Sequence, residues 1–95
     1  MSKKVIQSRL FARKVKTLHK QDKQALDDQV RKIIENPSIG DEKKGDLKGV
    51  FVYRFKLGST LYLLAYRFSS EVVELVMIGP HENYYRDLKS FIKAE

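Results

Sequence analysis

A single histidine, His81, lies where a predicted strand gives way to a predicted helix. The apolar run 72–78 is typical of a strand, and Gly79-Pro80 ends it because proline cannot extend a hydrogen-bonded ladder. Imidazole is the one side chain that ordinarily titrates near neutral pH, so a histidine at this position is a candidate general acid or base. The alternative is a capping or solvent-exposed histidine without a chemical role.

Arg54 and Lys56 alternate with large apolar residues in a second predicted strand. Period-two alternation places on one face of this strand the residues Phe51, Tyr53, Phe55 and Leu57. We therefore expect Arg54 and Lys56 to project from the opposite face, where they could bind an anion. The alternative is that both are solvated cations on an exposed sheet face.

Three further residues are expected near this cationic face. Lys48 directly precedes the strand that carries Arg54, and Arg67 lies on the following strand. Tyr85 follows His81 by four residues, which makes the two side chains neighbours if both belong to the C-terminal helix. Tyr85 also falls in the apolar stripe of that helix, so the alternative for it is a core position.

The residue types present exclude several kinds of catalytic site. The chain has no cysteine, His81 lacks the second histidine of a zinc signature, and Gly45 and Gly49 lack the strand–helix context of a phosphate-binding loop. No serine lies in a nucleophile elbow. We expect no metal and no cofactor. What remains is acid–base chemistry on an anionic substrate, and RNA fits because its own 2′-hydroxyl can be the nucleophile.

The net charge of +7 is concentrated toward the N-terminal end. Residues 1–20 hold seven of the 19 Lys and Arg residues and none of the 12 Asp and Glu residues. Such a positive field attracts phosphates without reading sequence, so Arg13, Lys14 and Lys16 are candidate contacts to an RNA backbone. The alternatives are attraction of an acidic protein partner, or a basic face that only aids solubility.

Length and composition predict one folded domain, residues 1–95. Hydrophobic residues make up 42% of the chain and charged residues 33%, which is typical of a globular protein and not of a disordered tail. No stretch has the length and apolarity of a signal peptide or a membrane span, so a cytoplasmic location is expected.

Two amphipathic helices are predicted in the N-terminal half. Ser8 is expected to cap the first and Asp22 the second, and Asn36-Pro37 ends the second. Their apolar stripes are Leu10, Phe11, Val15 and Leu18, and Leu26, Val30, Ile33 and Ile34. We expect an antiparallel helical hairpin with both stripes on one sheet, followed by a polar loop over 38–49.

Three strands and a helix are predicted in the C-terminal half. Segments 50–57, 61–68 and 71–78, joined by tight turns, predict an antiparallel meander. A helix over about 82–93 follows. Val5 and Ile6 give a weak signal for a short edge strand. The expected fold class is therefore α+β, an N-terminal helical hairpin packed on an antiparallel meander with a C-terminal helix.

This layout and its motifs resemble the RelE/ParE toxins of bacterial type II toxin–antitoxin systems. The most specific part of the resemblance contains Leu47-Lys48-Gly49, Tyr53-Arg54-Phe55-Lys56-Leu57 and Tyr62-Leu63-Leu64-Ala65-Tyr66. In the RelE branch, two basic positions of the first meander strand belong to the RNA-cleaving site, and they match Arg54 and Lys56. The branch also has a basic residue or histidine after the last strand's glycine, matching His81, and an aromatic residue downstream, matching Tyr85.

One departure from the RelE pattern is Leu63, which stands where many members of the branch have an arginine. A histidine-bearing subset similar to YafQ also has leucine there, and its His-x-x-x-Phe ending resembles His81 through Tyr85. That subset uses additional histidines that this chain lacks. Arg67 lies on the same strand face as Leu63 and is a candidate replacement for the missing cation.

The resemblance implies a toxin that cleaves mRNA in the 30S decoding site of the ribosome. His81 would be the general acid or base, Lys56 and Arg54 a base or phosphate-stabilising cations, and Tyr85 a positioner of base or phosphate. It also implies an acidic antitoxin that forms a hetero-oligomer with the toxin. The alternative, from the ParE branch, is a non-enzymatic inhibitor of DNA gyrase. A third interpretation is a nucleic-acid or ribosome binder without toxicity.

Overall fold

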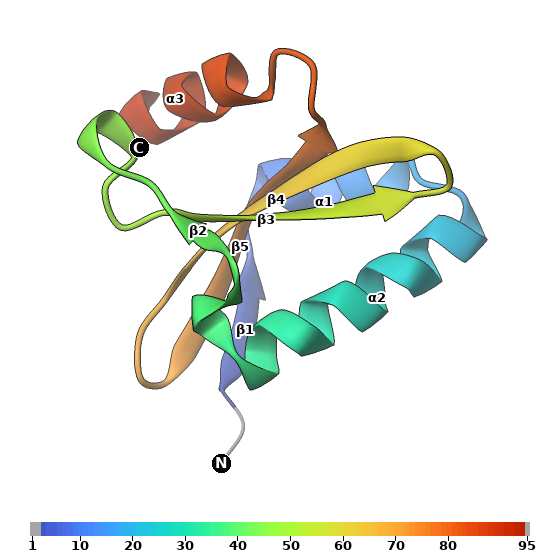
Figure 1. The fold of residues 1–95 in the computed structure, drawn as a ribbon, viewed down its shortest axis with the longest axis horizontal. Coiled ribbons are helices and arrows are strands. Elements are labelled where there is room, and N and C mark those ends of the chain that lie inside the picture. Colours follow the sequence, from blue (N-terminus) through green and yellow to red (C-terminus); the bar gives the residue numbers. More distant parts are fainter. Residues whose placement is uncertain (1–2, 95) are drawn as a thin grey trace.

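The computed structural model describes residues 3–94 as one sheet with helices on both faces (Figure 1). The elements in chain order are β1 (Lys4–Gln7), α1 (Arg9–Lys16), α2 (Lys20–Glu35), the 3-10 helix η1 (Pro37–Ile39), β2 (Asp41–Glu42), the 3-10 helix η2 (Gly45–Leu47), β3 (Phe51–Leu57), β4 (Thr60–Phe68), β5 (Val72–Pro80) and α3 (Tyr84–Ala94). The five strands lie in the order β1-β5-β4-β3-β2. Of the helices in this part of the chain, none is long and apolar enough to cross a membrane.

The predicted meander is present as β3, β4 and β5, but the predicted order of elements is only partly right. A strand comes first, because β1 precedes the helical hairpin and pairs in parallel with β5. The weak signal at Val5 and Ile6 marks this strand. The segment predicted as a loop over 38–49 also contains β2, which pairs antiparallel with β3. The sheet is therefore mixed rather than a pure antiparallel meander.

Helices α1 and α2 cover one face of the sheet, as the apolar stripes predict, except that Leu10 packs against the core on the opposite face. The Ser8 side chain caps α1 by accepting a hydrogen bond from the backbone N–H of Phe11 at 3.0 Å. The buried residues of this layer are Phe11, Leu26, Ile33, Phe55, Leu57, Leu64, Tyr66, Val73, Leu75 and Ile78. Asp22 is not the cap of α2, because His19 holds that position and Asp22 lies in the first turn. The helix ends at Glu35, directly before Asn36-Pro37.

Helix α3 packs on the opposite face of the sheet (Figure 1). The buried residues there are Leu47, Val50, Val52, Leu63, Ala65, Val76, Met77, Tyr84 and Leu88. The Tyr84 hydroxyl donates a hydrogen bond to the Met77 carbonyl at 2.7 Å, and burial raises the pKa of Tyr84. The helix begins at Tyr84 and not at Glu82, because Asn83 adopts a left-handed conformation with φ 59°. Two polar residues of β3, Arg54 and Lys56, remain exposed on this face.

A buried tyrosine fixes the segment that leads from α2 to β2. The Tyr66 hydroxyl donates to the Pro37 carbonyl at 2.7 Å and accepts from the Gly40 N–H at 2.9 Å. Burial raises the pKa of Tyr66, and the hydrogen bond from Gly40 opposes that shift. A Cβ atom at Gly40 would lie 2.8 Å from the Tyr66 hydroxyl, so only glycine fits without displacement. This contact positions β2 at the sheet edge beside β3.

Candidate functional site

Lys56 and His81 lie at the two ends of one row across the sheet. Lys56 on β3 is the partner of Leu61 on β4, and the backbone N–H of His81 donates to the Leu61 carbonyl at 3.1 Å. Lys56 and His81 are therefore separated by two strand spacings, roughly 10 Å between backbones. Both side chains are exposed.

The backbone of His81 is fixed on both sides of the residue. In addition to the N–H bond to Leu61, its carbonyl accepts a hydrogen bond from the Tyr84 N–H at 3.2 Å. The imidazole itself has no protein partner among residues 3–94. A ring with a fixed attachment point and two unused nitrogens can donate or accept a proton from a bound molecule.

Arg54 lies in the next row, where it pairs with Leu63, which in turn pairs with Gly79. Its guanidinium is 4.0 Å from the Asp41 carboxylate of β2, with 60% and 67% of the two side chains exposed. At this distance and exposure the ion pair is weak, because water screens it. Arg54 is thus available to an anion, although Asp41 competes for it.

Tyr85 is half-buried and does not lie beside His81 in the way the sequence predicts. His81 precedes the helix, which begins at Tyr84, so the expectation of neighbouring positions on a helix is wrong for this pair. Tyr85 packs instead at the border of the core beneath α3, and the Lys43 ammonium lies 5.2 Å from the centroid of its ring. The sequence does not assign Lys43 to the site, because the charged segment around β2 shows no strand pattern.

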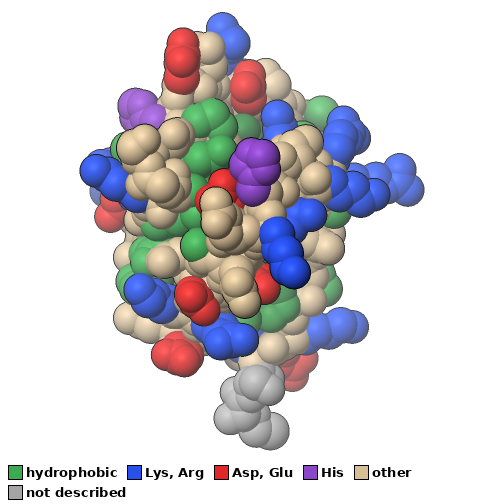
Figure 2. Space-filling model, turned by 90° about the vertical axis from the view of Figure 1, so that its right-hand side faces the viewer, with side chains coloured by type: hydrophobic (Ala, Val, Ile, Leu, Met, Phe, Trp, Pro, Cys, Tyr) green, Lys and Arg blue, Asp and Glu red, His purple; other side chains and the backbone are tan. Residues whose placement is uncertain are grey.

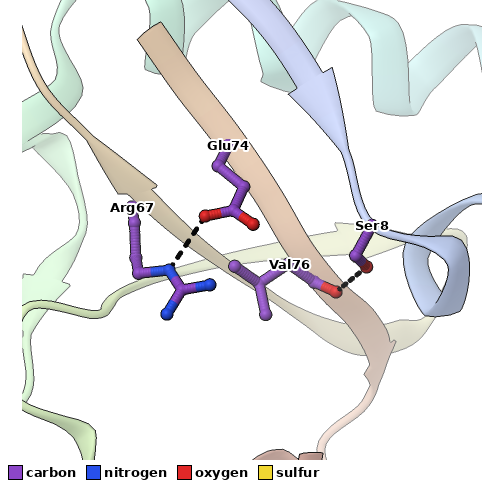
Figure 3. A network of polar contacts seen from close by, with 4 residues as sticks. All are labelled: Ser8, Arg67, Glu74 and Val76. Carbon is purple, nitrogen blue, oxygen red and sulfur yellow. Dashed lines mark hydrogen bonds and ion pairs between the residues drawn. The ribbon is translucent and has the colours of Figure 1, made fainter. Parts of the chain in front are cut away.

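The structure places Arg67 at the other end of the same sheet face. It lies four residues beyond Leu63 on β4, roughly 13 Å along the strand, and pairs across to Glu74 on β5. Its Nε donates to the Glu74 carboxylate at 3.0 Å (Figure 3). Because the guanidinium is engaged there, Arg67 is not brought into the row of Lys56 and His81.

The remaining basic candidates lie on other surfaces. Arg13, Lys14 and Lys16 are exposed on α1, under the opposite face of the sheet from α3. Figure 2 shows several Lys and Arg side chains on the right-hand side of that view, with others spread over the rest of the face among Asp and Glu side chains. Lys48 is exposed at the end of η2, on the loop that contacts α3. The basic residues of α1 therefore lie on a different surface from the row that contains Lys56 and His81.

The described residues do not form a cluster suited to a metal ion. Within residues 3–94, no three His, Cys, Asp or Glu side chains lie close enough together to hold one. The end of the sheet instead carries an exposed imidazole and ammonium at the two ends of one row and an exposed guanidinium in the next row. Such a set can move protons and stabilise negative charge.

The fold is a small α+β domain with an exposed group of basic residues at one end of its sheet. The family model described as "ParE-like toxin of type II bacterial toxin-antitoxin system" matches residues 5–89. The chain therefore belongs to this family, within the RelE/ParE superfamily. No curated protein matches the chain significantly.

Solved structures of RelE toxins share the fold. A mutant of the E. coli toxin RelE in the free state has a TM-score of 0.74 at 18% identity, with 100% of both chains covered. The Mycobacterium tuberculosis RelBE2 toxin-antitoxin complex gives 0.73 at 19% identity, covering 85% of this chain and 100% of that chain. The intact E. coli RelBE complex gives 0.67 at 21% identity, covering 84% and 98%.

Proposed function

We propose that this toxin is a metal-free endoribonuclease that cleaves mRNA in the 30S decoding site and so inhibits translation. The observation that carries the proposal is the row in which Leu61 holds His81 opposite Lys56, with Arg54 in the next row. All three side chains are exposed, and Arg54 and Lys56 share one sheet face. The fold shared with RelE toxins supports the same activity.

The chemistry requires only groups that this row supplies. A base removes the proton of the RNA 2′-hydroxyl, whose oxygen attacks the adjacent phosphorus. The bond from phosphorus to the 5′-oxygen breaks, and an acid protonates that oxygen as it leaves. The products are a 2′,3′-cyclic phosphate and a 5′-hydroxyl. His81 serves as acid or base, Lys56 supplies the other proton transfer or a cation, and Arg54 stabilises charge on the phosphoryl oxygens.

The test compares the two histidines of the chain. Replacing His81 with alanine should reduce the rate of mRNA cleavage roughly 10²–10⁴-fold, the usual worth of one acid–base group. His19→Ala is the matched control, since His19 is also exposed but lies in the turn before α2. Cleavage is measured by mapping the 5′ ends of transcripts after induction. Near-full cleavage by the His81→Ala protein would reduce His81 to a structural residue.

The second candidate function is inhibition of DNA gyrase without catalysis. Two observations favour it: the matching family model is ParE-like, and the fully buried Leu63 supplies no cation between Arg54 and Gly79. The two functions differ in their first cellular effect. A ribonuclease stops incorporation of labelled amino acids first, whereas a gyrase inhibitor first causes DNA damage and filamentation. The order of these events after induction decides between them.

An acidic antitoxin is the proposed protein partner. The net charge of +7 favours an acidic segment that folds as it binds. Structures similar to this chain include several complexes of RelE toxins with an antitoxin or an antitoxin peptide. Co-expression of the neighbouring gene followed by co-purification in low and high salt tests this pairing, and a basic or neutral partner would contradict it.

A further inference from the structure

Lys43 already occupies a face of the Tyr85 ring. The Lys43 Nζ lies 5.2 Å from the ring centroid, and the Tyr84 ring meets Tyr85 edge-on, with 5.7 Å between centroids and 89° between planes. A cation over an aromatic face is attracted by the negative charge of the π system. Tyr85 is therefore in contact with a cation before any substrate arrives.

The backbone of Lys43 is attached to the sheet edge that borders Arg54. Its N–H donates to the Val50 carbonyl at 2.8 Å, which continues the pairing of β2 with β3. Because side chains alternate along a strand, Lys43 shares a sheet face with Asp41, the neighbour of Arg54. The following 3-10 helix, η2, contacts α3, which carries Tyr85. The segment that carries Lys43 and the helix α3 that carries Tyr85 are therefore packed against each other through η2.

The ammonium of Lys43 has no competing anion in the part of the chain that the structure describes. Among residues 3–94, no carboxylate lies within ion-pair distance of it. An ammonium has three N–H donors, and the contact with the ring uses its charge rather than a hydrogen-bond acceptor. A phosphate can therefore bind Lys43 while the contact with Tyr85 persists. A nucleobase, in contrast, could stack on the covered face only after displacing the ammonium.

We propose that Lys43 is a substrate-binding residue that contacts a phosphodiester of the RNA strand, and that Tyr85 is a positioning residue that holds it. This inference rests on the proposed ribonuclease function and names how the strand is bound. Lysine binds phosphate as a point charge, so the contact adds affinity and salt dependence without reading the base.

The experiment measures binding without cleavage. The probe is a 70S ribosome programmed with a message whose decoding codon carries 2′-O-methyl groups, because a methylated 2′-oxygen cannot attack the phosphate. The dissociation constant is recorded over a range of KCl concentrations. Lys43→Gln should weaken binding roughly 10–100-fold, the worth of one hydrogen bond between charged groups, and lower the salt slope by about 0.7, as for one phosphate of a single strand. Lys43→Arg should bind like the parent.

The matched control is Lys32→Gln, which removes the same charge from the exposed surface of α2 and should leave binding unchanged. Tyr85→Phe keeps the aromatic face and should also bind like the parent. Tyr85→Leu should lower both affinity and salt slope, as Lys43→Gln does. The variant with both Lys43→Gln and Tyr85→Leu should bind no more weakly than the weaker single variant, because both changes remove one interaction.

A base-stacking role for Tyr85 predicts a different pattern and would overturn the proposal. In that case Lys43→Gln leaves binding unchanged or strengthens it, and Tyr85→Leu weakens binding without changing the salt slope. If Lys43→Gln fails to fold by thermal denaturation, Lys43→Met replaces it, since methionine keeps an unbranched apolar stem. A parent protein that binds and cleaves, with a Lys43→Gln protein identical to it, contradicts only the role of Lys43. A parent that neither binds nor cleaves contradicts the proposed function itself.

Discussion

Phe55 and Lys56 are adjacent residues with opposite environments. Phe55 is only 7% exposed and lies between the rings of Tyr53 and Tyr62, whereas Lys56 is exposed on the other sheet face. Phe55→Ala should lower the free energy of unfolding by about 3–5 kcal/mol, because it leaves a cavity in the layer beneath α1 and α2. Lys56→Ala should change it by less than about 0.5 kcal/mol. Urea denaturation measures both, and a loss below about 1 kcal/mol for Phe55→Ala would contradict its assigned burial.

Tyr84 makes stability depend on alkaline pH. Its folded-state pKa is raised above the ordinary value of 10.0, chiefly by burial. Above about pH 10 the unfolded chain therefore loses the phenolic proton while the folded chain keeps it, and stability falls as pH rises. Tyr84→Phe should cost about 1 kcal/mol at pH 8 because it removes the hydrogen bond to Met77. The variant should then lose less stability than the parent between pH 9 and pH 11. Equal losses in urea titrations would contradict the prediction.

The Ser8 side chain connects the start of α1 to the point in β5 where the pairing register with β4 shifts. The register of β4 and β5 shifts between Ala65 and Tyr66, so that Val76 has no partner residue on β4. The Ser8 hydroxyl donates to the Val76 carbonyl (Figure 3) and accepts from the Phe11 N–H. Ser8→Ala removes a helix cap and the hydrogen bond to the carbonyl of the buried residue Val76.

This change should destabilise the protein by about 1–3 kcal/mol. Ser8→Thr is the control, because threonine keeps the hydroxyl and also caps helices. Denaturant unfolding of the two variants measures the difference. A Ser8→Ala protein within about 0.5 kcal/mol of the parent would mean that water replaces the hydroxyl.

The elements that the sequence predicts correctly carry their own local pattern. Segment 51–57 alternates strictly, and the stripes of α1 and α2 repeat at helical spacing, so each element and its buried face follow from neighbouring residues. The pairing of β1 with β5 depends on residues far apart in the chain. Strand β2 consists of Asp41 and Glu42, whose charges carry no strand pattern. The pairing of β1 and the presence of β2 therefore could not be predicted from local sequence patterns.

The residues of the candidate site also fall into those that a local sequence pattern predicts and those that it does not. The exposure of Arg54 and Lys56 on one face follows from alternation. The prediction that Gly79-Pro80 ends the last strand is wrong, because both residues pair with β4 and β5 runs to Pro80, so that His81 directly follows the strand. The position of Tyr85 does not, because it depends on the left-handed conformation of Asn83. Asparagine tolerates that conformation better than most residues, so Asn83 is a signal in the sequence for a later helix start. The contact between Lys43 and Tyr85 joins a loop to a helix far along the chain and has no local signal.

The basic residues of α1 and the row of Lys56 and His81 lie on separate surfaces of the molecule. Changing Arg13, Lys14 and Lys16 together to glutamine should weaken ribosome binding and lower its salt slope by up to about 0.7–0.9 for each phosphate that the helix no longer neutralises. The His81→Ala protein should bind normally and fail to cut. Sedimentation with 70S ribosomes at several KCl concentrations measures both. Equal binding of the triple variant at every salt concentration would instead favour the antitoxin as the partner of this charge.

The parallel pairing of β1 with β5 has a consequence for biosynthesis. Ser8 and Val76, which bond across this junction, are 68 positions apart. A growing chain makes β1 first, but β1 must wait for β5 before it can join the sheet, and His81 is made later still. Contacts this distant in sequence also slow folding. Prematurely terminated products that end before residue 72 therefore lack β5, the strand that joins β1 to the rest of the sheet, and also lack His81.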